Sequence, residues 1–178
     1  KNDDSQPRDG LFPGSGIGMA LPVVSTNALA GLIEAINAEP NNGRADLPEL
    51  ASGLLYETDD LFPIAEVLQL LRFAELVGGD IKLLPAGRRY ALADVDERKK
   101  IFAQQLLSYV PLAAHIRRVL DDRPSHKSQA RRLHDELEGF MSESYASRTL
   151  QAVTQWARYA EDFAYHETTD LFSLDDPT

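Results

Sequence analysis

Apolar residues recur at helical spacing through the first half of the chain. A repeat of three to four residues places them on one face of a helix, where they can pack on a core. The pattern predicts three helices, over residues 28–36, 47–54 and 59–72. After the third helix, two apolar runs flank Gly78, Gly79 and Asp80, which is the pattern of a β-hairpin, and residues 85–87 are expected to close it. This order of elements predicts a winged helix over residues 25–93.

The second half of the chain repeats this plan. Apolar periodicity predicts helices over residues 94–107, 112–120, 128–140 and 142–160. Two short apolar runs, 163–165 and 171–174, then flank a polar turn and predict a second hairpin. We therefore expect a mainly α protein with short β-hairpins (an α+β fold), built as tandem winged-helix-like units over residues 25–93 and 94–174. A helical extension packed on the first unit is the alternative for the second half.

The two ends of the chain show no such periodicity. Residues 1–24 are rich in Gly, Pro, Ser and Asp, which predicts a flexible linker, and residues 175–178 form a short tail. Gly14, Gly16 and Gly18 resemble a phosphate-binding loop only superficially, because such a loop follows a strand and opens a helix. Without an initiator Met, the chain is expected to be part of a longer protein that extends upstream. A processed or tagged N-terminus is the alternative.

Composition narrows the class of protein. A hydrophobic fraction of 43% is sufficient for a sizeable core. The net charge of −10, from 18 basic and 28 acidic residues, argues against nonspecific binding to nucleic acid or to an anionic membrane surface. The absence of cysteine excludes disulfides and thiolate metal sites. No apolar run approaches the ~18 residues of a membrane-spanning helix.

The third predicted helix corresponds to the recognition helix of a DNA-binding winged helix, and its charge is wrong for that role. A helix that meets phosphates needs Arg or Lys. Its start and second turn carry four acidic residues instead: Glu57, Asp59, Asp60 and Glu66. Arg88 and Arg89 form the only local basic pair, well below the ~6–10 phosphate contacts of a committed DNA binder. These acids are a candidate protein-interaction face; a solvated face favoured by the helix dipole is the alternative.

Four longer runs of sequence resemble a known family. They are GRADLPELA (43–51), GDIKLLPAGRRYALADVDERKKIFAQQLL (79–107), VPLAAHIRRVLDDRP (110–124) and WARYAEDFAY (156–165). Together they resemble the AAA-associated C-terminal domain that follows the ATPase domain in some ATP-binding subunits of nitrate/sulfonate/taurine-type ABC transporters. The resemblance covers about residues 21–174.

The resemblance implies a function and a set of partners. The ATPase domain would lie upstream, and no Walker A pattern (GxxxxGK followed by Ser or Thr) occurs in this chain. We expect a non-catalytic regulatory or interaction domain without a cofactor, which docks on the ATPase domain or the ABC permease and pairs as a homodimer. It would be cytoplasmic and peripheral to the inner membrane, with no membrane insertion and no nucleic-acid partner. The alternative, supported by the predicted fold alone, is a DNA-binding winged-helix transcriptional regulator.

Two further groups of side chains are candidate binding sites. His115 and Arg118 lie three residues apart on one helix face and, with Arg158, could line an anion or effector pocket. Arginine forks fit sulfonate, nitrate or phosphate oxygens, although salt-bridged structural roles are the alternative. His134 and Glu138 have the i, i+4 spacing of two metal ligands, but no third ligand has suitable spacing, so no metal site is expected. Nothing in the sequence singles out catalytic residues.

Overall fold

The computed structural model describes residues 12–174. Within those residues it contains eight α-helices, one short 3-10 helix and two three-stranded antiparallel sheets, which is an α+β arrangement dominated by helices. The predicted class is confirmed at this level. No helix in the described part of the chain is both long and apolar enough to cross a membrane.

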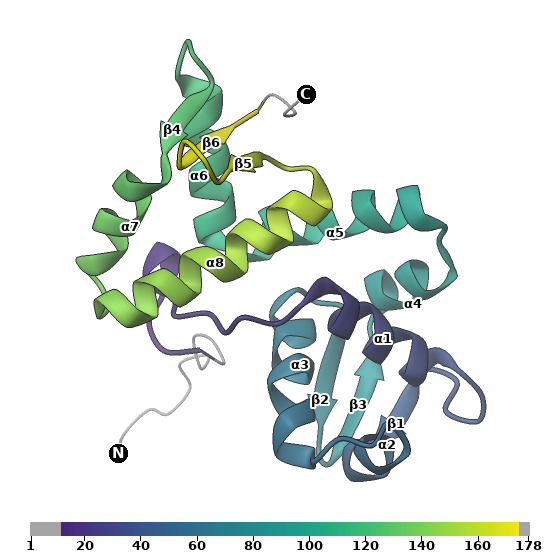
Figure 1. Cartoon of the computed structure of the whole chain (residues 1–178). Coiled ribbons are helices and arrows are strands. Elements are labelled where there is room, and N and C mark those ends of the chain that lie inside the picture. Colours follow the sequence, from purple (N-terminus) through teal and green to yellow (C-terminus); the bar gives the residue numbers. More distant parts are fainter. Residues whose placement is uncertain (1–11, 175–178) are drawn as a thin grey trace, which may run out of the picture.

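The first half places three helices around a small sheet, at the lower right of Figure 1. Its elements, in order, are α1 (Thr26–Asn37), β1 (Arg44–Asp46), α2 (Leu47–Gly53), α3 (Thr58–Leu70), β2 (Ala74–Val77) and β3 (Asp80–Leu83). The sheet has the strand order β1-β3-β2. The predicted hairpin is present, with Val77 opposite Asp80 in the register.

The second half repeats the order helix, strand, helix, helix, strand, strand. Two connecting helices, α4 (Pro85–Leu92) and α5 (Val95–Tyr109), lead into it. Its elements are α6 (Pro111–Asp122), β4 (Lys127–Gln129), α7 (Ala130–Glu138), α8 (Glu143–Ala160), β5 (Ala164–His166) and β6 (Leu171–Ser173). The strand order β4-β6-β5 matches that of the first sheet, position for position.

Two local predictions were wrong. Ser128 was expected at the start of a helix and instead lies on β4, with its side chain buried. Pro85 to Gly87 were expected to close the first hairpin, but they form the first turn of α4. A proline suits that place because the first amide groups of a helix have no acceptor within the helix.

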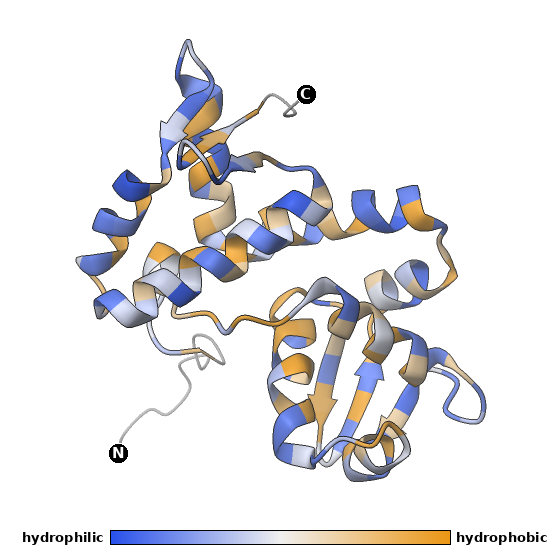
Figure 2. Ribbon diagram, in the orientation of Figure 1, coloured by the Kyte–Doolittle hydropathy of each residue, from blue (hydrophilic) through white to orange (hydrophobic). Residues whose placement is uncertain are grey.

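Part of the glycine-rich segment before α1 packs on other elements of the fold. Residues 12–24, here called the strap, bury Phe12, Leu21 and Val24. The Leu21 amide donates to Thr149 Oγ1 at 3.1 Å, and Trp156 Nε1 donates to the Val24 carbonyl at 2.8 Å. In Figure 2 the end of the strap is a hydrophobic stretch that leads from α8 to the start of α1. Residues 1–11 and 175–178, the rest of the expected linker and tail, lie outside the described residues.

One hydrophobic core extends through both halves. Phe102 of α5 stacks on Phe73 of the first half, with ring centroids 5.9 Å apart. The same ring packs edge to face on Tyr159 of α8, with centroids 5.1 Å apart. Gln105 Nε2 donates to the Leu71 carbonyl at 2.9 Å in the same buried region. The two halves are therefore held together by packing as well as by the chain that connects them.

Candidate functional site

The turn between α2 and α3 exposes an unusual amount of apolar surface. Leu55 is 95% exposed and has a φ of +61°, a left-handed backbone conformation that is uncommon for a residue with a side chain. The turn is held in place because the Tyr56 amide donates to the Ala51 carbonyl at 2.8 Å. Tyr56 and Phe62 are 45% and 42% exposed on either side of the start of α3. The fold thus holds Leu55 away from the core.

Acidic residues share this surface. Glu57 is the N-cap residue of α3, and Asp59 and Asp60 lie in its first turn; all three are exposed. Glu66, one to two turns further on, is half-buried, and this burial raises the pKa of its carboxyl group. Within the described residues, none of these four carboxylates forms an ion pair or a side-chain hydrogen bond. The negative charge is therefore available to an external partner.

These residues define the α2–α3 surface: Leu54, Leu55, Tyr56, Phe62, Glu57, Asp59 and Asp60. The sequence predicted its acidic half and missed its apolar half. The run Leu54-Leu55-Tyr56 could have given a signal, since it continues past the last buried position of the α2 stripe. Its chemistry suits a partner that offers both apolar and basic groups, and it is the wrong chemistry for phosphates.

A pocket of about 340 Å³ lies between α7, α8 and the β5–β6 hairpin. His134 Nε2 and Ser147 Oγ are 3.0 Å apart at one end. At the other end Arg158 Nη1 lies 3.7 Å from Glu167 Oε1, and the Tyr165 hydroxyl donates to Asp170 Oδ1 at 2.6 Å. The carboxylate and the burial together raise the pKa of Tyr165 to about 12.

The three residues of the predicted anion site occupy different surroundings. Arg158 lines this pocket, whereas His115 and Arg118, on α6, are not among its lining residues. His115 Nε2 lies 2.9 Å from Glu136 Oε2 and so makes the kind of structural contact considered as the alternative. Arg118 forms no ion pair with any residue between 12 and 174. An anion site formed by all three remains a prediction.

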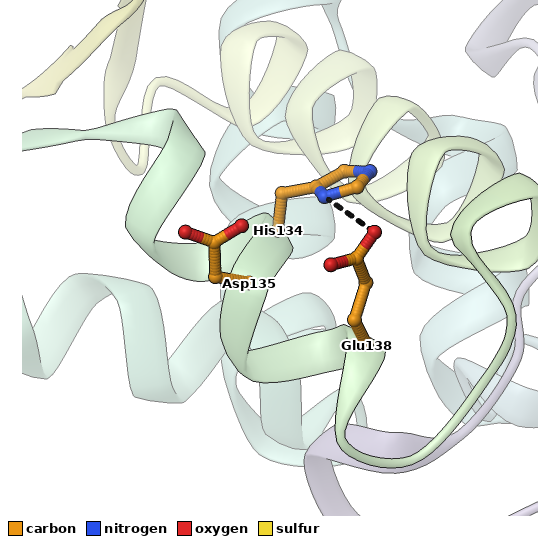
Figure 3. A group of neighbouring side chains, drawn as sticks. All are labelled: His134, Asp135 and Glu138. Carbon is orange, nitrogen blue, oxygen red and sulfur yellow. Dashed lines mark ion pairs between the residues drawn. The ribbon is translucent and has the colours of Figure 1, made fainter.

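Three potential metal ligands gather on α7, shown in Figure 3. His134 Nδ1 lies 3.7 Å from Glu138 Oε1, which is the pair noted in the sequence, and Asp135 is the third residue of the group. Ligand atoms of the three side chains all lie within 4.8 Å of one another. Asp135 is drawn beside His134 in Figure 3, and Arg131 Nε pairs with its Oδ1 at 3.2 Å. This pair occupies one Asp135 oxygen and places a positive charge beside the group, which opposes the binding of a cation. The three side chains are therefore a poor metal-ligand set as they stand.

A buried carboxyl group escaped the sequence prediction altogether. Asp162, directly after α8, is only 5% exposed, and its Oδ2 has no hydrogen-bond partner among the described residues. Burial raises its pKa to about 7, while the Arg117 guanidinium acts in the opposite direction. Arg117 Nη1 donates to the Asp162 main-chain carbonyl at 2.7 Å. The carboxyl group is far from the α2–α3 surface in the chain, and its surroundings point to a structural role.

Comparison with known proteins identifies one family. The model of the C-terminal AAA-associated domain matches residues 48–166, which run from α2 to β5 and include every helix from α3 to α8. Searches of curated proteins and of solved structures found no match.

Proposed function

Because the chain belongs to the family of C-terminal AAA-associated domains, we propose that it is a non-catalytic accessory domain that regulates an ATPase by docking. The family match supports the association with an ATPase. The resemblance of four sequence runs supports a narrower assignment, to the ATP-binding subunit of a nitrate/sulfonate/taurine-type ABC transporter. On this proposal the ATP site lies on another domain, and this chain changes how that domain works.

The architecture supports a modular docking role. We propose that residues 25–93 and 94–174 are two winged-helix units, each with one three-stranded sheet. Support comes from the shared element order and from the matching strand orders β1-β3-β2 and β4-β6-β5. A winged helix can serve protein binding as well as DNA binding, since a fold alone does not fix function.

The observation that carries the docking proposal is the α2–α3 surface. Leu55 is almost fully exposed, and transferring a leucine side chain from water into an interface contributes roughly 1.5–3 kcal/mol. Asp59 and Asp60 beside it lack internal partners, so they can attract a basic partner and orient it during encounter. A buried apolar anchor with a charged rim is the usual anatomy of a specific protein interface.

Regulation follows if docking has two states. In one state the domain packs on its own ATPase domain, on the paired subunit or on the permease; in the other it is released. A ligand or a partner shifts this balance only when it binds the two states unequally. On this proposal the protein acts at the cytoplasmic face of the inner membrane, through the transporter complex, and the domains of two paired ATP-binding subunits meet as a homodimer.

Charge reversal on the α2–α3 surface tests the proposal. In the full-length ATP-binding subunit, Asp59→Lys combined with Asp60→Lys should weaken docking and change the ATPase rate at low salt. Lowering the salt concentration should enlarge the difference from the unchanged protein, because exposed charges interact over only ~10 Å at 0.1 M salt. ATP hydrolysis, and transport in vesicles, would be measured with and without the permease.

A matched control comes from the first turn of α5. Asp96 and Glu97 are also an exposed acidic pair in a helical first turn. Asp96→Lys combined with Glu97→Lys therefore removes the same favourable charge from a helix N-terminus and should leave ATPase and transport unchanged. Equal behaviour of the two double variants would refute docking through the α2–α3 surface. If deletion of residues 21–178 left ATPase and transport unchanged at all substrate levels, the regulatory role itself would be refuted.

A further inference from the structure

The pocket between α7, α8 and the β5–β6 hairpin has the construction of a small-molecule site. Its volume of about 340 Å³ falls within the ~300–1,000 Å³ range of ligand pockets. Its floor contains the buried apolar side chains of Ala130, Leu150 and Phe172. Its rim is polar. An apolar floor with a few polar groups around it binds a ligand by contact and orients it by hydrogen bonds.

One wall is a stripe of hydrogen-bonding side chains on α8. Ser147, Gln151, Gln155 and Arg158 all line the pocket and recur at intervals of three to four residues, so they share one face of the helix. At a rise of 1.5 Å per residue the stripe is about 16 Å long. Gln151 and Gln155 are exposed, and within residues 12–174 neither amide group forms a hydrogen bond. Both side chains keep their donors and acceptors free for a ligand.

Opposite charges meet at the end of this stripe. Arg158 is half exposed, and its separation of 3.7 Å from Glu167 is too long for a hydrogen bond, so the fork of the guanidinium remains open. Asp170 lines the same end and accepts the Tyr165 hydroxyl. Helix α8 ends nearby at Ala160, where the helix dipole presents partial negative charge. One cation therefore faces two carboxylates and a helix C-terminus.

This arrangement selects among classes of ligand. A nucleotide or another polyanion would be repelled by Glu167 and Asp170. A wholly apolar molecule would bury the Gln151 and Gln155 amides without partners, which is unfavourable. A molecule with one carboxylate and one ammonium group fits both signs of charge. Its carboxylate can accept two parallel hydrogen bonds from Arg158, and its ammonium group can pair with Glu167 or Asp170.

We propose that this pocket binds a free α-amino acid with an uncharged polar side chain. Its carboxylate lies on Arg158, its ammonium group faces Glu167 and Asp170, and its side chain extends along Gln155 and Gln151. The site lies on the second half of the chain and does not depend on the α2–α3 surface, so it holds whether or not that surface docks a partner.

Calorimetric titration of the whole 178-residue chain with glutamine tests this site. The expected result is saturable binding that weakens about tenfold or more in Arg158→Gln, as a charge-assisted pair is lost. Arg148→Gln is the matched control: this arginine is on the same helix and exposed, but it stacks on Tyr145 and does not line the pocket. Binding by Arg148→Gln should equal that of the unchanged chain, and circular dichroism would verify that both variants are folded.

Three further probes separate the alternatives. Ethylamine carries only the ammonium group, phosphate only negative charge, and acetylglutamine methylamide the amide groups of a peptide without either charge. All three should bind at least about tenfold more weakly than glutamine, since each lacks at least one of the paired charges. The proposal is overturned if glutamine does not bind or if Arg158→Gln binds it normally. It is equally overturned if phosphate or the blocked peptide binds as tightly as glutamine, which would make the pocket a simple anion site or a peptide groove.

Discussion

At the scale of single residues, the environment of Asp162 differs strongly from that of a free side chain. It follows Glu161, whose left-handed backbone (φ +60°) ends α8 and turns the chain toward β5. The turn carries Asp162 into the interior, where its Oδ2 has no partner among the described residues. Burial of this carboxyl group favours its protonated form, and its pKa of about 7 lies well above the ordinary value of 3.8.

Asp162 should make the protein less stable as the pH rises. Between about pH 4 and pH 7 the folded protein keeps a proton on this carboxyl that the unfolded chain has lost, so the free energy of unfolding falls with pH across this window. Asp162→Asn should remove this fall and leave the variant roughly 1–4 kcal/mol more stable than the unchanged chain at about pH 8. Urea unfolding at about pH 5 and about pH 8 measures both effects. Asp122→Asn, at an exposed acidic position, should show the same fall in the free energy of unfolding between the two pH values as the unchanged chain. If Asp162→Asn also kept this fall, the raised pKa would not belong to Asp162.

At the scale of elements, periodicity predicted seven of the eight helices that the structure describes, all but α4, and it missed the strands β1 and β4. Ser25, Asp46 and Ser142 are the N-cap residues of α1, α2 and α8, and each side chain accepts a hydrogen bond from a main-chain amide in the first turn that follows. Strands β1 and β4 have three residues each, with only the middle one buried. Each of these two strands runs directly into a helix, and three residues before a helix are too few to be distinguished from the start of that helix. Their pairing with β3 and β6 depends on contacts distant in sequence, which local patterns do not encode.

Gly87 of α4 lies very close to the main chain of Phe73, just before β2. A Cβ atom at this position would collide with the Phe73 carbonyl oxygen, because α4 packs directly against the start of the hairpin. Gly87→Ala should therefore destabilise the protein by about 1–3 kcal/mol, measured as the free energy of unfolding in urea. The contrasting variant is Gly53→Ala, at the open end of α2, where a Cβ would meet nothing and should stabilise by about 0.5–1 kcal/mol. If the two variants changed the free energy of unfolding equally, α4 would not lie this close to the Phe73 carbonyl group.

At the scale of the whole molecule, the sequence predicted the charged candidate residues but not which side chains the fold brings together on one surface or in one pocket. The acids of the α2–α3 surface were expected from their place in the third helix, whereas the exposure of Leu55 and Phe62 depends on how α2 and α3 pack. Arg158 was expected to bind a ligand, yet its pocket neighbours are Glu167 and Asp170 rather than His115 and Arg118. Such groupings arise from tertiary contacts between elements, and a single sequence does not specify them.

The continuous core predicts that both halves unfold together. Phe102 contacts Phe73 on one side and Tyr159 on the other, so neither half can open without exposing apolar surface of its neighbour. Trp156, the only tryptophan, is buried in α8 and reports on the second half, while far-ultraviolet circular dichroism reports on all helices. Urea unfolding curves from the two signals should coincide, as in a two-state transition. A fluorescence midpoint displaced from the dichroism midpoint would show that the halves unfold separately.

The strap also constrains the order in which the protein can be assembled on the ribosome. Its two hydrogen bonds to α8 join residues separated by 128 and 132 positions in the sequence. The strap therefore leaves the ribosome long before its acceptor Thr149 and its donor Trp156 exist. Its apolar side chains Leu21 and Val24 must remain uncovered, or associate with a chaperone, while the intervening helices are synthesised. Closure of this long loop must wait for α8, so the strap reaches its native place only after the helices that follow it in the sequence have been synthesised.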